Sequence, residues 1–288
     1  MLIDTKKSAE QFLINNFPAQ KIVVLGEGRH SFAFLVEDYV FRFPRDAKHV
    51  KKYKRSAHVL SLLRPVVGTL VPDLMVVQDN NGIVYSSHKM IPGNYWTPDD
   101  LNIVPARVQN LLARDYAKFL YAVHSVRLDS FAQKNKSDLP VMTRERMREL
   151  ADNKIPKDKL DKIYERYRSV VAAPRGGDIV LLHADLSGKN SVVDDNFRLA
   201  GVFDFDNSAL GERAWDFIRF YKPGSMTLLN KILREYGKIS GVAFDMEQVA
   251  DACLWDAVNS ARDIGKAGTD ESQWATRQNL FVERMGRF

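Results

Sequence analysis

Two acids and an amide within residues 179–216 have the types and the order needed to handle a cation and a proton. Asp185 and Asn190 lie in one short polar segment, and Asp204 follows the second of the two apolar runs that come after it. Carboxylate and amide oxygens are hard ligands of the kind that Mg²⁺ takes, while water and phosphates complete its shell. Asn190 and Asp204 are therefore candidate magnesium ligands, and Asp185 is a candidate base for the proton of an attacking hydroxyl.

The apolar runs around these residues predict the elements that position them. Residues 179–182 have the composition of a buried strand. The segments that follow have a hairpin pattern, in which two apolar arms enclose a turn rich in Asp and Asn: 191–193, 194–196 and 199–203. Because a hairpin returns the chain to its starting point, we expect Asp204 to lie beside Asn190.

This arrangement suits phosphoryl transfer from a nucleotide to a hydroxyl. Such a reaction needs metal ions to neutralise the phosphates and a carboxylate to orient the attacking hydroxyl, with little covalent chemistry from the protein. Each residue taken alone has an ordinary alternative, because Asp and Asn favour turns and helix N-caps. The set of Asp185, Asn190 and Asp204, in this order and spacing, favours phosphoryl transfer.

The same segment resembles the aminoglycoside phosphotransferase family, antibiotic kinases related to protein kinases. The resemblance is carried by His183-x-Asp185-x4-Asn190, the hairpin, Phe203-Asp204-Phe205 and Trp215-Asp216-Phe217. It implies an α+β, bilobal protein-kinase-like fold. The N-terminal lobe, residues 1–90, would be an antiparallel sheet that binds nucleotide. The mainly helical C-terminal lobe, residues 91–288, would carry the catalytic loop and the substrate site.

A turn with two glycines near the start of the chain is a candidate phosphate-binding loop. Three apolar runs predict strands: 22–25, 32–36 and 39–43. Gly26, Gly28 and Ser31 lie between the first two of these strands. Glycine lets the backbone approach a phosphate without a Cβ in the way. An ordinary hairpin turn is the alternative, but the resemblance implies a glycine loop at this place in the chain.

Arg42, in the third of these strands, occupies the position where the family has a lysine that reaches the nucleotide phosphates. Arginine is cationic and forked, so it can bind phosphate, although it is not equivalent to lysine. In the family a glutamate on the next helix holds the lysine, and we expect this helix over residues 50–63. The matching position is Ser56, and the segment contains no acid. The resemblance therefore does not say how Arg42 is oriented.

A second hairpin over residues 74–90 leads to the predicted hinge. Its turn contains Asn81-Gly82, a strong hairpin signal. The segment after it resembles the family's hinge between lobes, where adenine bonds to backbone groups. Lys89, Met90 and Ile91 are the candidate contacts there. The base would also lie against apolar side chains of both lobes: Val36, Val192 and Val202.

Residues 244–263 are candidates for the substrate site, because five acids face a single base, Arg262, in this stretch. An acidic cleft would attract a polycationic substrate through its field; the alternative is a solvated helix face. Asp251, Trp255 and Asn259 fall at i, i+4 and i+8, on one helix face, and could form a wall for an amino-sugar. A tryptophan at such a position is more often part of the core.

Other polar residues near the trio have more structural interpretations. Asp206 is a candidate to contact the substrate or to support the metal site. Lys189 would meet the γ-phosphate or face solvent. The resemblance implies that His183 braces the loop with the metal aspartate and that Asp216 ties down a neighbouring loop. We expect His124 to be a packed core residue.

Composition sets the class of protein. The 288 residues are 45% hydrophobic and 27% charged, as in an ordinary soluble protein, and the single cysteine, Cys253, excludes an intrachain disulfide. No apolar run approaches the ~18 residues of a membrane span, and the first residues lack the apolar core of a signal peptide. We expect a cytoplasmic monomer that does not bind a membrane.

The net charge of +6 could indicate a nucleic-acid partner. Eight basic residues, against Asp46 as the one acid, account for the densest patch: Arg42, Arg45, Lys48, Lys51, Lys52, Lys54, Arg55 and Arg64. A surface for single-stranded nucleic acid would interleave aromatics with these bases, and only Tyr53 does so. The patch favours a solvated helix face, so we expect no nucleic-acid partner.

The first functional hypothesis is therefore a kinase that phosphorylates a hydroxyl of an aminoglycoside-type antibiotic, with Mg²⁺ and ATP or GTP. The second is a kinase of another small molecule, such as a macrolide, a choline-like or homoserine-like compound or a sugar, because one scaffold serves many substrates. The third is a nucleotide-binding pseudokinase, which Arg42 and the missing glutamate motivate.

Overall fold

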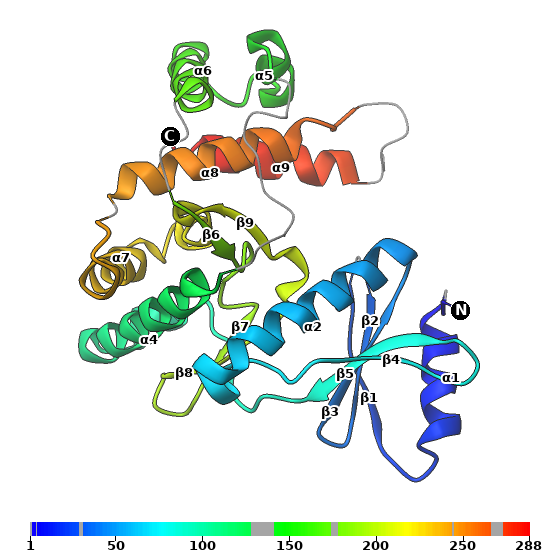
Figure 1. The fold of residues 1–288 in the computed structure, drawn as a ribbon. Helices are drawn as coiled ribbons and strands as arrows, with labels where there is room; N and C mark the ends of the chain where they lie inside the picture. Colours follow the sequence, from blue (N-terminus) through cyan, green and yellow to red (C-terminus); the bar gives the residue numbers. More distant parts are fainter. Residues whose placement is uncertain are drawn as a thin grey trace.

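The structure is a computed structural model, and it describes residues 2–3, 5–28, 31–127, 141–173, 178–243, 245–265 and 273–288. Its N-terminal part is a five-stranded antiparallel sheet with the order β1-β2-β3-β5-β4 (Figure 1). The strands are β1 (Ile22–Glu27), β2 (Ser31–Val36), β3 (Tyr39–Pro44), β4 (Met75–Gln78) and β5 (Val84–Lys89). All five predicted strands are present.

Strand register decides which face of the sheet each side chain occupies. Phe34 lies opposite Phe41, and Ala33 lies opposite Arg42. Since side chains alternate between the two faces of a strand, the phenylalanines share one face. There they form a core with Ala9 of helix α1 (Lys6–Asn16). Arg42 is on the other face, against which helix α2 packs.

Helix α2 (Ala47–Val67) connects the two parts of the molecule (Figure 1). It begins earlier than predicted because the side chain of Asp46 accepts a hydrogen bond from the backbone nitrogen of His49 as an N-cap. Its first half lies against the sheet. Its second half buries Val59, Leu60 and Leu63 in the core of the C-terminal part.

The C-terminal part is mainly helical and carries two small antiparallel strand pairs. Its helices are α3 (Asp100–Ile103), α4 (Ala106–Ser125), α5 (Arg144–Ala151), α6 (Lys157–Ala172), α7 (Met226–Ser240), α8 (Met246–Ala261) and α9 (Trp274–Met285). In Figure 1, α5 and α6 lie beyond α8 and α9, at the end of the molecule farthest from the N-terminal sheet. The sequence also predicts a loop over residues 129–140, and this segment falls outside the described residues.

The strand pairs in the C-terminal part hold the predicted catalytic segment. Strand β6 (Ile179–Leu182) pairs with β9 (Ala209–Glu212), and β7 (Ser191–Val193) pairs with β8 (Leu199–Val202). The predicted strand at 179–182 and the predicted hairpin are confirmed, whereas β9 was not predicted. Between β8 and β9 the chain forms a short 3-10 helix, η2 (Phe205–Asn207), and two more follow: η3 (Arg213–Asp216) and η4 (Ile218–Phe220).

The predicted α+β architecture, with an antiparallel sheet before a helical region, is confirmed. Because α2 belongs to both parts, the lobe boundary at residue 90 stays a proposal. None of the helices in the described ranges has the length and apolar character needed to cross a membrane.

Candidate active site

The hairpin brings Asp185, Asn190 and Asp204 together. The backbone nitrogen of Phe203 donates to the carbonyl of Asn190 at 3.0 Å, so the next residue, Asp204, lies beside Asn190. The amide nitrogen of Asn190 donates to the backbone carbonyl of Asp185 at 2.8 Å and to its Oδ2 at 3.2 Å. The amide oxygen of Asn190 is then the atom that a cation would take.

The backbone on each side of this trio is held in an uncommon conformation. Ala184 (φ 65°) and Asp204 (φ 63°) are both left-handed, which costs energy in residues with a Cβ and recurs at functional sites. The carboxylate of Asp216 accepts hydrogen bonds from the backbone nitrogens of His183 (3.0 Å) and Ala184 (2.6 Å). It therefore ties down the loop that carries Asp185.

Asp216 belongs to a buried polar network. It pairs with His124 at 3.1 Å, and the other ring nitrogen of His124 lies 2.8 Å from the hydroxyl of Tyr236. Burial acts to raise the pKa of Asp216, but its hydrogen bonds and the nearby histidines outweigh burial and lower the pKa. His124 is a buried core residue, as predicted.

His183 braces the loop and is not placed to act as a base. Its Nδ1 accepts a hydrogen bond from the backbone nitrogen of Asp185 at 3.2 Å, so the neutral ring carries its proton on Nε2, which donates to the carbonyl of Phe203 at 3.0 Å. The ring is fully buried and thus joins the segment before Asp185 to the one before Asp204.

Arg42 points from the N-terminal sheet towards Asp204, the candidate metal ligand. Its Nη2 lies 3.5 Å from Asp204 and 2.8 Å from Asp206, and its guanidinium lies 5.2 Å from the ring centroid of Tyr53. Burial acts to lower the pKa of Arg42, but the neighbouring carboxylates raise it, so the side chain stays charged. Arg42, the predicted phosphate-binding residue, and Asp204, the predicted metal ligand, therefore face one another.

Asp206 is not placed as a substrate residue. It is 4% exposed; its Oδ2 accepts from Arg42, and its Oδ1 accepts from the hydroxyl of Ser56 at 2.9 Å. Its backbone carbonyl accepts from Arg55 at 2.7 Å. The segment after Asp204 is thus joined to α2, at the position where the resemblance implied a glutamate.

Asp185 has a partner that the sequence analysis missed. Nε of Arg219, on η4, donates to Oδ1 of Asp185 at 2.9 Å, and Nη1 donates to Asp256 at 3.3 Å. Asp256 also accepts from Arg284 at 2.6 Å. Burial acts to lower the pKa of Arg219, but Asp256 and Asp185 raise it. A single arginine after Trp215-Asp216-Phe217 gives no signal in the sequence for this role.

The acids within α8 are paired with arginines. Asp251 forms a 2.7 Å ion pair with Arg166 of α6. Trp255 is 7% exposed and packs edge-on against Trp215 at 4.6 Å between ring centroids, so it lies in the core and forms no substrate wall. The amide nitrogen of Asn259 donates to the carbonyl of Trp255. The predicted acidic cleft is therefore largely neutralised by the protein itself.

The glycine loop is described except for residues 29–30. The backbone nitrogen of Gly28 donates to the carbonyl of Ser31 at 3.0 Å, so the two described ends of this loop are joined. The register of β1 shifts between Val24 and Gly26, as at a β-bulge. Among the described residues, no heavy atom would lie within 4 Å of a Cβ on Gly26, so their packing does not require glycine there.

The candidate hinge packs on the hairpin of β7 and β8. A Cβ on Gly201 of β8 would lie 2.4 Å from the side chain of Ile91, and Asn94 forms a β-bridge with Val193. The backbone nitrogen of Met90 already donates to Asp38 at 2.7 Å, and Lys89 forms an ion pair with the same residue. Among the candidate hinge groups, the amide of Met90 is thus occupied.

The apolar wall for a base differs from the predicted one at one position. Val36 lies on the sheet face that packs with α1, so its prediction as a cleft residue is wrong. Leu35, one residue earlier, shares the face of Arg42, because alternate residues of a strand face opposite sides. Val192 and Val202 are buried in the hairpin.

The donor atoms fit a magnesium ion that shares its shell with phosphates. Partial burial and the neighbouring Asp206 raise the pKa of Asp204, while Arg42 acts to lower it, so a cation there would stabilise the charged carboxylate. No group of three His, Cys, Asp or Glu side chains in the described ranges could hold a metal alone. Mg²⁺ commonly binds one or two side chains plus phosphates and water, which matches Asn190 and Asp204.

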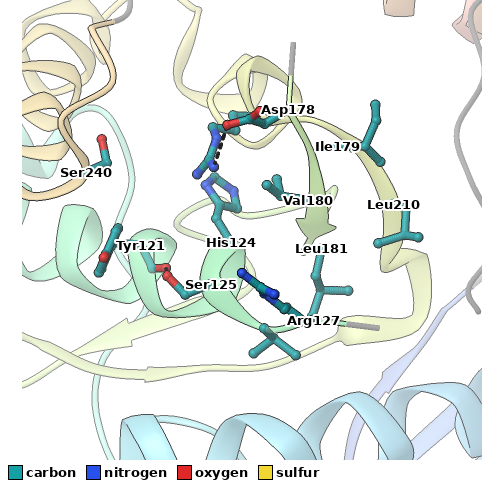
Figure 2. Close-up of a pocket in the computed structure, with 12 residues that line it drawn as sticks. Tyr121, His124, Ser125, Arg127, Asp178, Ile179, Val180, Leu181, Leu210 and Ser240 are labelled. Atoms are coloured by element: carbon teal, nitrogen blue, oxygen red, sulfur yellow. Dashed lines mark hydrogen bonds and ion pairs between the residues drawn. The ribbon is translucent and has the colours of Figure 1, made fainter. Parts of the chain in front are cut away.

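A cavity of about 650 Å³ lies elsewhere, between the end of α4 and strands β6 and β9 (Figure 2). Figure 2 shows Tyr121 and His124 on one side of it and Ile179 and Leu210 on the other. None of the candidate site residues lines this cavity. Its walls include the ends of segments that continue outside the described ranges, so we assign it no ligand.

Comparison with known proteins identifies the family of this chain. The model of the phosphotransferase enzyme family matches residues 21–251, which is most of the chain. The structure is similar to the GDP complex of wild-type aminoglycoside 2'-phosphotransferase-IIIa, with a TM-score of 0.79, 18% sequence identity, and 98% of this chain and 99% of that chain covered.

Two other solved structures give the same fold. The gentamicin complex of APH(2")-IIa has a TM-score of 0.72, 20% identity and full coverage of both chains. Macrolide 2'-phosphotransferase type I has a TM-score of 0.68, 18% identity, and coverage of 98% of this chain and 99% of that chain. At these identities the likeness establishes the fold, and the acceptor must be argued from the site.

Proposed function

The chain belongs to the phosphotransferase enzyme family, and from this premise we propose that it transfers the γ-phosphate of a nucleoside triphosphate to a hydroxyl of a small molecule. The observation that carries the proposal is the trio of Asp185, Asn190 and Asp204, joined by the hairpin and the hydrogen bonds of Asn190. The pseudokinase alternative is disfavoured because all three side chains are present and adjacent.

Each residue has one role in this proposal. Asp185 orients the acceptor hydroxyl and takes its proton as the oxygen attacks phosphorus. Asn190 and Asp204 would hold Mg²⁺, which neutralises charge on the transferring phosphate. Arg42 and the loop from Gly26 to Ser31 hold the phosphates. The nucleobase of the donor lies between the hinge and the hairpin.

The donor and the first acceptor candidate follow from the similar structures. Those proteins were solved with GDP, ADP or ATP, and with kanamycin, gentamicin or streptomycin. We therefore propose ATP or GTP as the donor and an aminoglycoside hydroxyl as the first acceptor to test.

The charges around Asp185 favour a second candidate, an acceptor that carries a carboxylate or phosphate. Arg219 contacts Asp185 directly. Lys222 follows closely in the chain, and its pKa is lowered by burial and by the positive charges of Lys189, Arg287 and Arg219. Lys222 and Lys189 therefore add positive charge near Arg219, whereas Arg287 is paired with Glu283 and the acids of α8 are paired with arginines. A homoserine-like acceptor would fit this field better than an aminoglycoside.

One experiment tests the function and ranks the acceptors. Nucleotide turnover with Mg²⁺ is measured with aminoglycosides, macrolides, choline, sugars, hydroxy acids and sugar phosphates, in the wild type and in Asp185→Asn. The variant should lose about 10²- to 10⁴-fold in acceptor-dependent turnover, with nucleotide affinity close to that of the wild type. Turnover that persists in Asp185→Asn would show that another group is the base.

A further inference from the structure

In protein kinases the phosphate-binding lysine works only when a glutamate on the following helix holds it. Here the cation is Arg42 and the matching helix position is Ser56, which bears no charge. We propose that Asp206 supplies the missing carboxylate, so that the segment after the metal ligand, and not helix α2, positions the phosphate-binding cation.

The contacts of Asp206 are those that this role requires. Its Oδ2 lies 2.8 Å from Nη2 of Arg42, and its Oδ1 accepts a hydrogen bond from Ser56 at 2.9 Å. The carboxylate is 6% exposed and the Arg42 side chain is 18% exposed, so solvent screens the pair weakly. Ser56, 1% exposed, supports the carboxylate from the place where a glutamate would otherwise stand.

The backbone explains how Asp206 reaches this position. Asp204 is left-handed, and η2 follows it directly, so the chain turns towards α2 immediately after the metal candidate. The carbonyl of Asp206 is fixed by Arg55 of the same helix. In protein kinases the corresponding triplet is Asp-Phe-Gly, whereas here it is Asp204-Phe205-Asp206. A carboxylate therefore occupies the place of a residue without a side chain.

The geometry leaves Arg42 suited to its task. Both carboxylate contacts use Nη2, so Nε and Nη1 are the nitrogens that would meet a phosphate. The Tyr53 ring supports the guanidinium on another side. Asp204 and Asp206 are two residues apart, and both contact Arg42. One short segment therefore carries the candidate metal ligand and also positions the phosphate-binding arginine.

The test moves the carboxylate from position 206 to position 56. Dissociation constants of Mg-ATP and Mg-GTP are measured by calorimetry for the wild type, Asp206→Asn, Asp206→Gly, and the double variant Asp206→Gly with Ser56→Glu. Thermal unfolding of each variant shows that it is folded. We expect Asp206→Asn and Asp206→Gly to weaken nucleotide binding about tenfold or more, and the double variant to recover most of this loss.

The matched control is Asp115→Asn, which breaks a two-contact ion pair with Arg198 at 2.6 Å, outside the candidate site. It should leave nucleotide affinity within about twofold of the wild type. The proposal is overturned if folded Asp206→Asn binds nucleotide as tightly as the wild type. It is also overturned if Ser56→Glu fails to restore binding to a folded Asp206→Gly protein, because Asp206 would then act only through packing.

Discussion

The guanidinium of Arg219 lies 2.9 Å from the carboxylate of Asp185, the proposed catalytic base. An arginine in direct contact with a base fixes its orientation and also presents a positive charge where the acceptor must approach. The same arginine reaches Asp256, which Arg284 of α9 holds from the other side. The catalytic loop is therefore connected to the C-terminal helices through a chain of alternating charges.

Replacing Arg219 with glutamine should change the KM of an acceptor in a direction that depends on the acceptor's charge. We expect KM for carboxylate- or phosphate-bearing acceptors to rise about tenfold, and KM for cationic acceptors to stay the same or fall. Removing one side of a close charge pair across an interface typically costs enough for such a change. Steady-state kinetics with a hydroxy acid and with kanamycin check this. An equal rise in KM for both acceptors would indicate that Arg219 only supports the loop.

Two glycines should respond in opposite ways to substitution. Gly26→Ala should fold normally, because no atom of the described residues lies within 4 Å of the new Cβ, and should weaken nucleotide binding if the loop lies against phosphates. Gly201→Ala should lower the unfolding free energy by about 1–3 kcal/mol, because its Cβ would overlap the Ile91 side chain. Urea unfolding and nucleotide calorimetry on both variants measure the two effects. Unchanged nucleotide affinity in Gly26→Ala would contradict the phosphate-loop assignment.

Trp255→Ala should act on stability. We expect the unfolding free energy to fall by about 3–5 kcal/mol, because a buried indole and its contact with Trp215 are lost. The exposed Ile103, replaced with alanine, should change it by less than about 0.5 kcal/mol. Denaturant unfolding compares the two. A small loss of stability in Trp255→Ala, together with a large rise in acceptor KM, would indicate that Trp255 contacts the substrate.

Stability should depend on the ionisation of Asp216. Its pKa is lower in the folded state than the ordinary value of 3.8. The stabilisation is therefore complete above that ordinary value and is lost as the pH falls through the lower folded-state pKa. Between pH 6 and pH 3 the wild type should lose more unfolding free energy than Asp216→Asn. Urea unfolding at both pH values measures this, and equal losses would show that Asp216 does not couple folding to protons.

Local patterns in the sequence were enough to predict most elements. Apolar residues between positions 108 and 123 recur at helical spacing and predict a helix over residues 106–125, which are the bounds of α4. The hairpin of β7 and β8 followed from two apolar arms and an Asx turn. Strand β9 was missed because Ala209–Glu212 has no strong strand pattern, and its partner β6 is far away in the sequence.

The contacts that define the site could be predicted only in part. The hairpin made the proximity of Asn190 and Asp204 a local inference. The roles of Asp206 and Arg219 depend on Ser56 and Asp185, which are 150 and 34 residues away in the sequence. The acids of α8 suggested an open acidic face for the same reason: the sequence does not show that α6 and α9 bring arginines to them.

The attachment of α2 has a consequence for regulation. In protein kinases, moving the equivalent helix switches the phosphate-binding ion pair on or off. Here Val59, Leu60 and Leu63 anchor α2 in the larger core, and the carboxylate partner of Arg42 lies outside the helix. An outward swing of α2 would have to break that core. A displacement of the first half of α2 would therefore reach Arg42 through Tyr53 and through the segment after Asp204, which Arg55 and Ser56 hold.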